Sequence, residues 1–310
     1  MDGLGIEGKT VVIVGASSGW GRGAAKEFAE QGARVVVNGR NPDAVRHVVE
    51  EIQADGGVAI GYPAAVHTSE GAAALTSAAL EHFGNIDVLV NSSGGKVTGT
   101  IVELSEEAFD ESIDAQLKAP FLTTHHVAKA MVASDVRGRI INMAGGASVR
   151  PLYAESLHCA TKGGLLAATW TWALELEPYG ITVNAVRGGV RSNGTEPLIA
   201  RMRERLGAGG SVISDRELGF YEAEEVASLL VWLASPATAA ITGQFIGIDG
   251  PKLTVWDLPM LHAQLFDVQG WDYPHLDSIL RPVLEQGTRR ARQESQVMES
   301  LKLVGAPSSS

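Results

Sequence analysis

The sequence predicts an α/β fold in which a parallel sheet carries helices on both faces. Short β-branched runs alternate with longer helical patterns, and a glycine-rich turn joins the first run to the first helix. Neither an internal repeat nor an interdomain linker interrupts the series. Strands that alternate with helices form parallel sheets, because each helix carries the chain back to the edge where the next strand starts. We therefore expect a single doubly wound domain.

Apolar periodicity and helix caps place the individual elements. The strands are predicted at residues 9–14, 33–38, 58–62, 86–91, 139–143, 181–186 and 244–248. The helices are predicted at residues 22–31, 42–55, 69–83, 158–177 and 222–234, with a long helix from a cap at Ser105 to about residue 132. Residues 191–220 are glycine-rich and irregular, and this segment is long enough to be a substrate lid.

Composition excludes several classes of protein. The chain has 310 residues, of which 25 are Lys or Arg and 36 are Asp or Glu; the net charge is −11, and no basic cluster suggests a nucleic-acid partner. No apolar run reaches the ~18 residues that a membrane span needs, and the first residues lack the features of a secretion signal. The single cysteine excludes a disulfide framework and a cysteine metal cluster. We expect a cytoplasmic protein with a small-molecule substrate.

The turn after the first strand has the pattern of a phosphate-binding loop. Its residues are Gly15, Ser17, Ser18, Gly19, Trp20 and Gly21. Glycines let a backbone turn tightly and approach a pyrophosphate, whose charge is stabilised at the N-terminus of the following helix. The position between a strand and a helix favours dinucleotide binding over a tight turn without a ligand.

The end of the second strand indicates which dinucleotide binds. An NAD site usually has an acidic residue here to hold the ribose hydroxyls. This chain has Asn38 and Gly39 instead, followed by Arg40, whose guanidinium can pair with a 2′-phosphate. The pattern favours NADP(H) over NAD(H), and the alternative is an ordinary exposed arginine.

Taken together, the motifs over residues 7–250 resemble those of the short-chain dehydrogenase/reductase family. The matching segments are Gly15-x-x-x-Gly19-x-Gly21, Asn91-Ser92-Ser93-Gly94, the segment around Lys162, Asn184-Ala185-Val186, Ile241-Thr242-Gly243-Gln244 and Asp249-Gly250. The resemblance implies a seven-stranded Rossmann fold that binds NAD(P)(H), in a homodimer or homotetramer. It also implies cofactor contacts by the glycines to the pyrophosphate, by Arg40 to the adenosine phosphate, by Asn91 and Gly94 to the adenosine side, and by Lys162 to the nicotinamide ribose.

Three of the four catalytic positions depart from the family pattern. The family tyrosine, four residues before the lysine, is His158 here; the serine thirteen residues before the tyrosine is Gly145; and the helical asparagine is Gln116. Only Lys162 is kept. His158 and Lys162 lie four apart on a predicted helix and so share a face, where the ammonium favours the neutral imidazole. Two polar groups on a solvated face are the alternative.

A histidine suits the acid–base role of the replaced tyrosine. A free tyrosine titrates near ~10 and a histidine near ~6.5, so His158 needs no assistance to exchange protons near neutral pH. The remaining candidate residues of the substrate pocket are Ser93, Gly145, Ser148, Tyr153 and Asn193, with Tyr153 as a possible displaced acid. No metal site is expected, because His125 and His126 have no supporting ligand spacing.

These residues support three hypotheses for function. The first is an NADP(H)-dependent carbonyl or alcohol oxidoreductase in which His158 replaces the tyrosine. The second is a redox-neutral lyase, isomerase or cyclase that uses His158 for proton transfer and keeps the cofactor as a scaffold. The third is a non-catalytic NADP(H)-binding subunit. The intact glycine loop and Lys162 disfavour the third hypothesis, and family descent favours the first.

The resemblance stops at about residue 250. Residues 251–310 form an extension that is too apolar for a free tail, with two tryptophans, Trp256 and Trp271, in its first part. We expect the extension to pack on the core, on a neighbouring subunit or over the substrate mouth.

Overall fold

The computed structural model describes residues 4–95, 97–192, 195–196, 199–200, 203 and 214–257. The chain divides into two compact units, one of Met1–Ile199 with Ile213–Trp256 and one of Ala200–Val212 with Asp257–Ser310. The first unit holds nearly all of the described residues. Asn193 and most of the predicted extension lie outside them.

The first unit is built on one sheet of eight strands in the order β3-β2-β1-β4-β5-β6-β7-β8. The first seven are β1 (Thr10–Val14), β2 (Arg34–Gly39), β3 (Val58–Pro63), β4 (Val88–Asn91), β5 (Arg139–Met143), β6 (Thr182–Arg187) and β7 (Phe245–Asp249). All of the pairings among these seven strands are parallel. The sequence-based prediction of a doubly wound parallel sheet is thus confirmed.

An eighth strand was missed by the sequence analysis. β8 (Lys252–Trp256) pairs antiparallel with β7, so the sheet is mostly rather than wholly parallel and the extension begins inside the sheet. Asp249 pairs with Lys252, which leaves a two-residue loop that starts at Gly250 with φ +56°. A glycine with positive φ at this position matches the twist of a tight hairpin.

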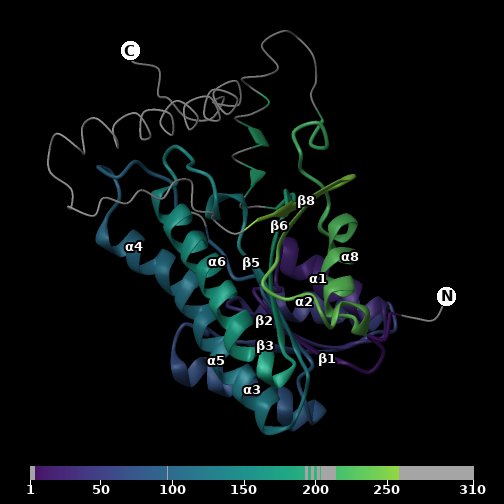
Figure 1. Ribbon diagram of the computed structural model, residues 1–310. Coiled ribbons are helices and arrows are strands. Elements are labelled where there is room, and N and C mark those ends of the chain that lie inside the picture. The colour runs from purple at the N-terminus through teal and green to yellow at the C-terminus, as the bar shows by residue number, and fades with distance from the viewer. Residues whose placement is uncertain are drawn as a thin grey trace, which may run out of the picture. The chain divides into compact units, whose positions relative to one another are not determined.

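Helices cover both faces of the sheet (Figure 1). One face carries α1 (Gly19–Glu30), α2 (Pro42–Ala54) and α8 (Ala223–Ala234), and the other carries α3 (Ser69–Phe83), α4 (Glu106–Ile113), α5 (Ala119–Ala133) and α6 (Ser156–Leu176). Each layer has its own apolar core, which includes Phe28 on the first face and Leu75 on the second. The predicted long helix is interrupted, because a π-helical turn (Asp114–Lys118) separates α4 from α5.

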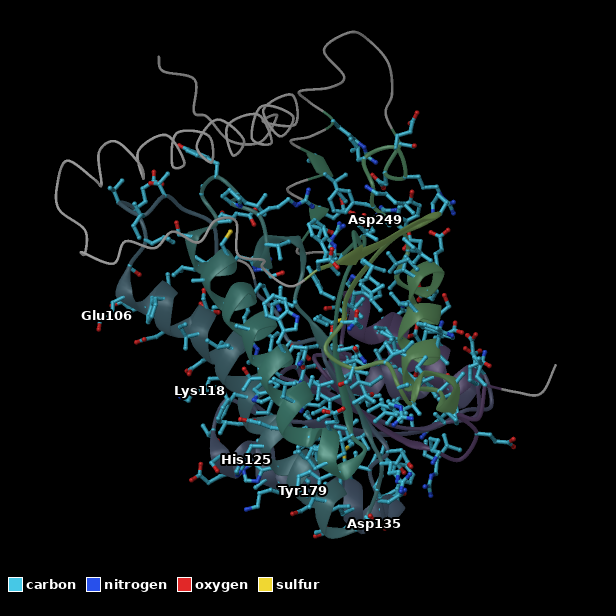
Figure 2. All side chains as sticks on the ribbon, viewed as in Figure 1. Glu106, Lys118, His125, Asp135, Tyr179 and Asp249 are labelled. Carbon is cyan, nitrogen blue, oxygen red and sulfur yellow. The ribbon has the colours of Figure 1, made fainter. Side chains whose placement is uncertain are left out.

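The strand order reverses between β1 and β4, and this position determines where a ligand fits. In open α/β sheets, the crevice beyond the carboxyl ends of the strands at such a reversal is the usual binding site. Asp249, at the end of β7, lies at the carboxyl edge of the sheet. Asp135 and Tyr179, which precede β5 and β6, lie at the opposite edge (Figure 2). The candidate site residues therefore belong at the Asp249 edge.

We predict that Phe28→Ala lowers the free energy of unfolding by about 3–5 kcal/mol, because the ring is fully buried between α1 and the sheet and its removal leaves a cavity. Phe109→Ala is the matched control, since Phe109 is 48% exposed on α4 and should cost under ~1 kcal/mol. Urea denaturation followed by circular dichroism compares the two. Equal losses would show that the α1 layer does not form the core described here.

Candidate active site

His158 lies in the first turn of α6 and contacts Gln116 in the π-helical turn. The Nδ1 atom of His158 is 2.8 Å from Oε1 of Gln116. The same oxygen accepts a hydrogen bond of 3.2 Å from the hydroxyl of Thr161, while Nε2 of Gln116 donates to the carbonyl oxygen of Gly95. A π-turn inside a helix often marks a functional site, and here it positions Gln116 against α6.

These contacts determine which nitrogen of His158 carries the proton. A carbonyl oxygen only accepts hydrogen bonds, so Gly95 requires the NH₂ group of Gln116 and turns Oε1 toward His158. Because Oε1 is an acceptor, the neutral imidazole must carry its proton on Nδ1. The lone pair of the neutral ring then lies on Nε2.

Gly145 lies next to Nε2 of His158. It follows β5 with φ +76°, and a Cβ built on it would be 3.9 Å from Nε2 of His158. The N–H of Gly145 points to the carbonyl oxygen of Val186, whereas the N–H of Gly146 has no acceptor within the described part of the chain. Ser148 turns its hydroxyl toward the carbonyl oxygen of Gly145 at 2.6 Å. Of the two amides, only that of Gly146 is available to a substrate oxygen.

Lys162 is buried below this site rather than paired with His158. Its Nζ donates a 2.8 Å hydrogen bond to the carbonyl oxygen of Met143, and only 6% of the residue is exposed. Burial disfavours the ammonium and lowers the pKa of Lys162 to about 8. The predicted shared helical face is present, but the two side chains have different hydrogen-bond partners.

The glycine loop is shaped to receive a phosphate. A Cβ on Gly15 would be 2.8 Å from the backbone of Ser93, and one on Gly21 would be 2.2 Å from the carbonyl oxygen of Gly15. Ser18 caps α1 without a side-chain hydrogen bond, and the first turn of the helix has no acidic residue. The N-terminus of α1 therefore presents unpartnered N–H groups and no opposing charge, which suits a pyrophosphate.

The end of β2 lacks any group that could hold ribose hydroxyls. The Asn38 side chain is buried and donates to the carbonyl oxygens of Tyr62 and Ala64, so it ties β2 to β3. Gly39 packs against Ser17 of the glycine loop, since a Cβ there would be 2.9 Å from the Ser17 hydroxyl oxygen. Arg40 follows directly and is exposed.

Two residues predicted to contact the cofactor use their side chains for internal contacts. The Asn91 amide donates to Thr124 and Asn142, and its oxygen accepts from Thr123. The Trp20 indole donates to the carbonyl oxygen of Gly188 at 3.3 Å and packs against that glycine. Gly94 is exposed, and the hydroxyl of Ser93 is buried without a hydrogen-bond partner in the described part of the chain.

The Trp20 contact also restricts the residue at position 188. A Cβ on Gly188 would be 2.5 Å from the Trp20 ring and 2.3 Å from the carbonyl oxygen of Ile248. No side chain fits at this position, which explains why the residue is a glycine.

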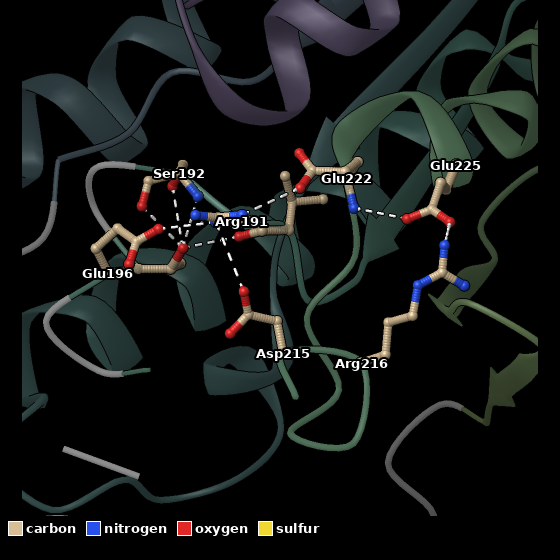
Figure 3. A network of polar contacts seen from close by, with 9 residues as sticks. Arg191, Ser192, Glu196, Asp215, Arg216, Glu222 and Glu225 are labelled. Atoms are coloured by element: carbon tan, nitrogen blue, oxygen red, sulfur yellow. Dashed lines mark hydrogen bonds and ion pairs between the residues drawn. The ribbon is translucent and has the colours of Figure 1, made fainter. Parts of the chain in front are cut away.

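Arg191 joins the two described ends of the predicted lid (Figure 3). Its Nε lies 2.9 Å from the carboxylate of Glu196 and 3.6 Å from that of Asp215, and its Nη1 lies 3.6 Å from Glu222. Glu196 belongs to the start of the segment and the other two to its end. The network holds these ends together beside β6.

Tyr153, the predicted displaced acid, is 57% exposed and has no side-chain hydrogen bond among the described residues, and its role stays a prediction. Among the residues that the structure describes, no group of three His, Cys, Asp or Glu side chains is placed to bind a metal ion. Within the same residues, no helix is both long and apolar enough to cross a bilayer.

The sequence model of the short chain dehydrogenase family matches residues 9–201, which is more than half of the chain. The chain belongs to the short-chain dehydrogenase family. The sheet order and the site at its carboxyl edge are in keeping with this membership.

Relatives of this short-chain dehydrogenase cover most of its length. It is 32% identical over 247 residues to the 3-oxoacyl-[acyl-carrier-protein] reductase FabG of Thermotoga maritima, with 79% of this chain and 98% of the relative covered. It is 31% identical over 253 residues to glucose 1-dehydrogenase 2 of Bacillus subtilis, with 79% and 95% covered. A crystal structure of a short chain dehydrogenase from Mycobacterium avium has a TM-score of 0.78 at 32% identity, covering 90% of this chain and 96% of that one.

We predict that Lys162→Met stabilises the enzyme near pH 7 by about 2 kcal/mol. A fall in pKa from 10.5 to about 8 means that the buried ammonium lowers the stability of the folded state by roughly 3 kcal/mol below pH 8. Methionine removes this cost but also removes the hydrogen bond to Met143, which contributes about 1 kcal/mol. Between pH 8 and 10.5 the unfolded lysine binds more protons than the folded one, so the parent gains stability as pH rises and the difference shrinks.

Urea denaturation of both proteins at pH 7 and pH 10 measures this effect. Lys129→Met is the control, since Lys129 is exposed on α5 and its substitution should change stability little at either pH. A destabilised Lys162→Met protein at pH 7 would contradict the burial argument.

Proposed function

We propose that the chain is an NADP(H)-dependent carbonyl or alcohol oxidoreductase in which His158 takes the place of the family tyrosine. The observation that carries the proposal is the fixed orientation of the imidazole, with Nδ1 donating to Gln116 and Nε2 directed at Gly145. Family membership supplies the reaction class, and the local contacts support a changed proton donor.

The proton steps follow from these contacts. During reduction, the protonated imidazole donates its Nε2 proton to the carbonyl oxygen of the substrate; during oxidation, the neutral imidazole removes the proton of the alcohol. The oxygen of Gln116 accepts a hydrogen bond from Nδ1–H in both states, so the ring does not rotate between them. The N–H of Gly146 is placed to hold the substrate oxygen in the absence of a serine hydroxyl. When bound, the nicotinamide supplies or accepts the hydride.

The residues at the reversal of the sheet fit an NADP(H) molecule. The glycine loop and the N-terminus of α1 suit the pyrophosphate, the buried hydroxyl of Ser93 is without a partner, and Arg40 suits the 2′-phosphate. Lys162 is held below His158 and is the candidate for the nicotinamide ribose. Because the Asn38 side-chain amide donates its hydrogen bonds to β3, it does not hold the ribose hydroxyls of NAD(H) at the end of β2.

A second candidate is a redox-neutral enzyme that removes a proton from the carbon next to a carbonyl. The position of Nε2 beside Gly145, which has no side-chain hydroxyl, favours it, because a base without the usual partner hydroxyl suits enolisation. A lyase, isomerase or cyclase of this kind would bind NADP(H) without consuming it. A non-catalytic subunit would bind NADP(H) and turn nothing over.

We further propose a homodimer or homotetramer. Phe121 on α5 and Leu174 on α6 are 52% and 73% exposed, and the Phe121 ring packs 5.9 Å from that of Trp172. Neighbouring exposed apolar side chains on two helices are suited to contact with another copy of the chain.

We predict that NADPH oxidation, followed at 340 nm with a panel of ketones and quinones, falls by about a thousandfold or more in His158→Phe, because the proton donor is removed. NADPH binding, measured by fluorescence titration, should be unchanged. His47→Phe is the control, since His47 is 70% exposed on α2. Unaltered turnover in His158→Phe would contradict the role of His158 as the proton donor. Product formation without any change in absorbance at 340 nm would indicate the redox-neutral reaction instead.

We predict that Arg40→Gln weakens NADPH binding by about 10- to 100-fold and leaves NADH binding nearly unchanged. The guanidinium contributes a charge-assisted contact to a 2′-phosphate that NADH lacks. Arg46→Gln, on the same side of the molecule but in an exposed pair with Asp43, should affect neither cofactor. An equal loss of affinity for both cofactors would place Arg40 outside the phosphate site.

A further inference from the structure

Two arginines lie next to the proposed reaction site. A Cβ built on Gly146 would be 3.3 Å from Nη2 of Arg150 and 3.4 Å from Nε of Arg187, so both guanidinium groups border this glycine. Gly145, the preceding residue, borders Nε2 of His158. Consecutive Cα atoms are only ~3.8 Å apart, so a small molecule at this dipeptide can reach the imidazole and a guanidinium together.

The sheet leaves room for the Arg187 side chain. Arg187 pairs with Gly247, which in turn pairs with Thr254, so the three residues are neighbours across β6, β7 and β8. A Cβ on Gly247 would be 3.3 Å from Nη1 of Arg187 and 3.3 Å from the Thr254 hydroxyl oxygen. Because Gly247 has no side chain, the guanidinium lies across the sheet and toward β8.

Three polar atoms on β6 and β8 lack a hydrogen-bond partner within the described part of the chain. The Nε of Arg187, the hydroxyl of Thr254 and the indole Nε1 of Trp256 are buried without hydrogen-bond partners. Asp249 accepts from Nη2 of Arg187 at 2.9 Å and from the backbone of Gly189 at 3.2 Å. Buried donors without partners are rare, and a group of them next to a cation indicates a missing acceptor.

The charges also favour an anion. Arg150 lies with its guanidinium 5.6 Å from the centre of the Trp256 ring, and its pKa is lowered by burial and then by the nearby charge of Arg187. Asp249 is paired with Arg187, and its charge also acts on Arg150. A planar carboxylate matches the guanidinium fork better than a hydroxyl or a neutral carbonyl does.

We propose that Arg187 and Arg150 form a carboxylate-binding subsite, and that the substrate is a small oxo or hydroxy acid. The inference rests on the proposed function, which puts the reacting carbon at His158. The carboxylate binds beside Gly146, and the oxygen that changes its protonation state binds beside Gly145. Trp256 and Thr254 bring β8 into the substrate site, although this strand lies beyond the part of the chain that the family model matches.

The test is calorimetric titration of the full chain with pyruvate at constant ionic strength and without nicotinamide cofactor. Methyl pyruvate provides the uncharged comparison, and inorganic phosphate tests for another anion. We expect pyruvate to bind more tightly than both, and Arg187→Gln to weaken pyruvate binding by about tenfold or more without changing that of methyl pyruvate. Arg46→Gln, an exposed arginine on α2, should bind pyruvate as the parent does.

Arg187→Gln also removes the ion-pair partner of Asp249 and could therefore affect folding. Two further variants control for this: the double variant Arg187→Gln/Asp249→Asn, in which an uncharged pair replaces the ion pair, and Arg150→Gln, which leaves the ion pair in place. Both should fold and bind pyruvate weakly. The proposal would be overturned if Arg187→Gln bound pyruvate as the parent does, or if the parent bound pyruvate no more tightly than methyl pyruvate. It would also be overturned if the variants lost folding stability but kept their affinity for pyruvate, because the arginines would then only stabilise β8. Tighter phosphate binding would overturn the carboxylate assignment. Since no cofactor or turnover is involved, these outcomes are separate from the fate of His158 in catalysis.

Discussion

The hydrogen bond between Gln116 and His158 is the interaction on which the chemistry of this site depends. The carbonyl oxygen of Gly95 orients the amide, the amide places the Nδ1 proton, and Nε2 lies on the side of Gly145. A carboxylate in place of Gln116 would hold the imidazolium more strongly and oppose its deprotonation. A neutral amide accepts from the ring in either charge state, which suits a group that must gain and lose a proton in each cycle.

Missing side chains shape the rest of the cleft. Gly15 lets the loop after β1 lie against the loop after β4, Gly145 opens the space beside the imidazole, and Gly247 lets Arg187 extend across the sheet. Each position would clash or be strained with a larger residue, or would fill space that a ligand needs. Charged and polar groups then gather around these gaps: α1 contributes its N–H groups on the cofactor side, and Arg187 contributes a cation on the substrate side.

The doubly wound sheet, the succession of strands and helices along the chain and the glycine loop could be predicted from sequence. They depend on hydrophobic patterns of period 2 and 3.6 and on the spacing of glycines. The role of Asn91 could not, since its three partners come from α5 and β5 and only tertiary packing shows that its side chain is used up. The same holds for Asn38, whose bonds to β3 leave Arg40 as the polar group at the end of β2. Arg187 was also missed, because nothing in its own stretch reveals that Gly146 and Gly247 make room for its guanidinium.

The β7–β8 hairpin has a consequence for how the sheet can grow. β8 occupies the free hydrogen-bonding edge of β7, so a strand of another chain can add to β7 only by displacing β8. The edge now offered to solvent carries Lys252, a charged residue of the kind that discourages edge-to-edge pairing, together with outward-facing Leu253 and Val255. The β7–β8 hairpin, which turns at one positive-φ glycine, thus blocks the addition of a further strand to β7. The same hairpin places Trp256 next to Arg150.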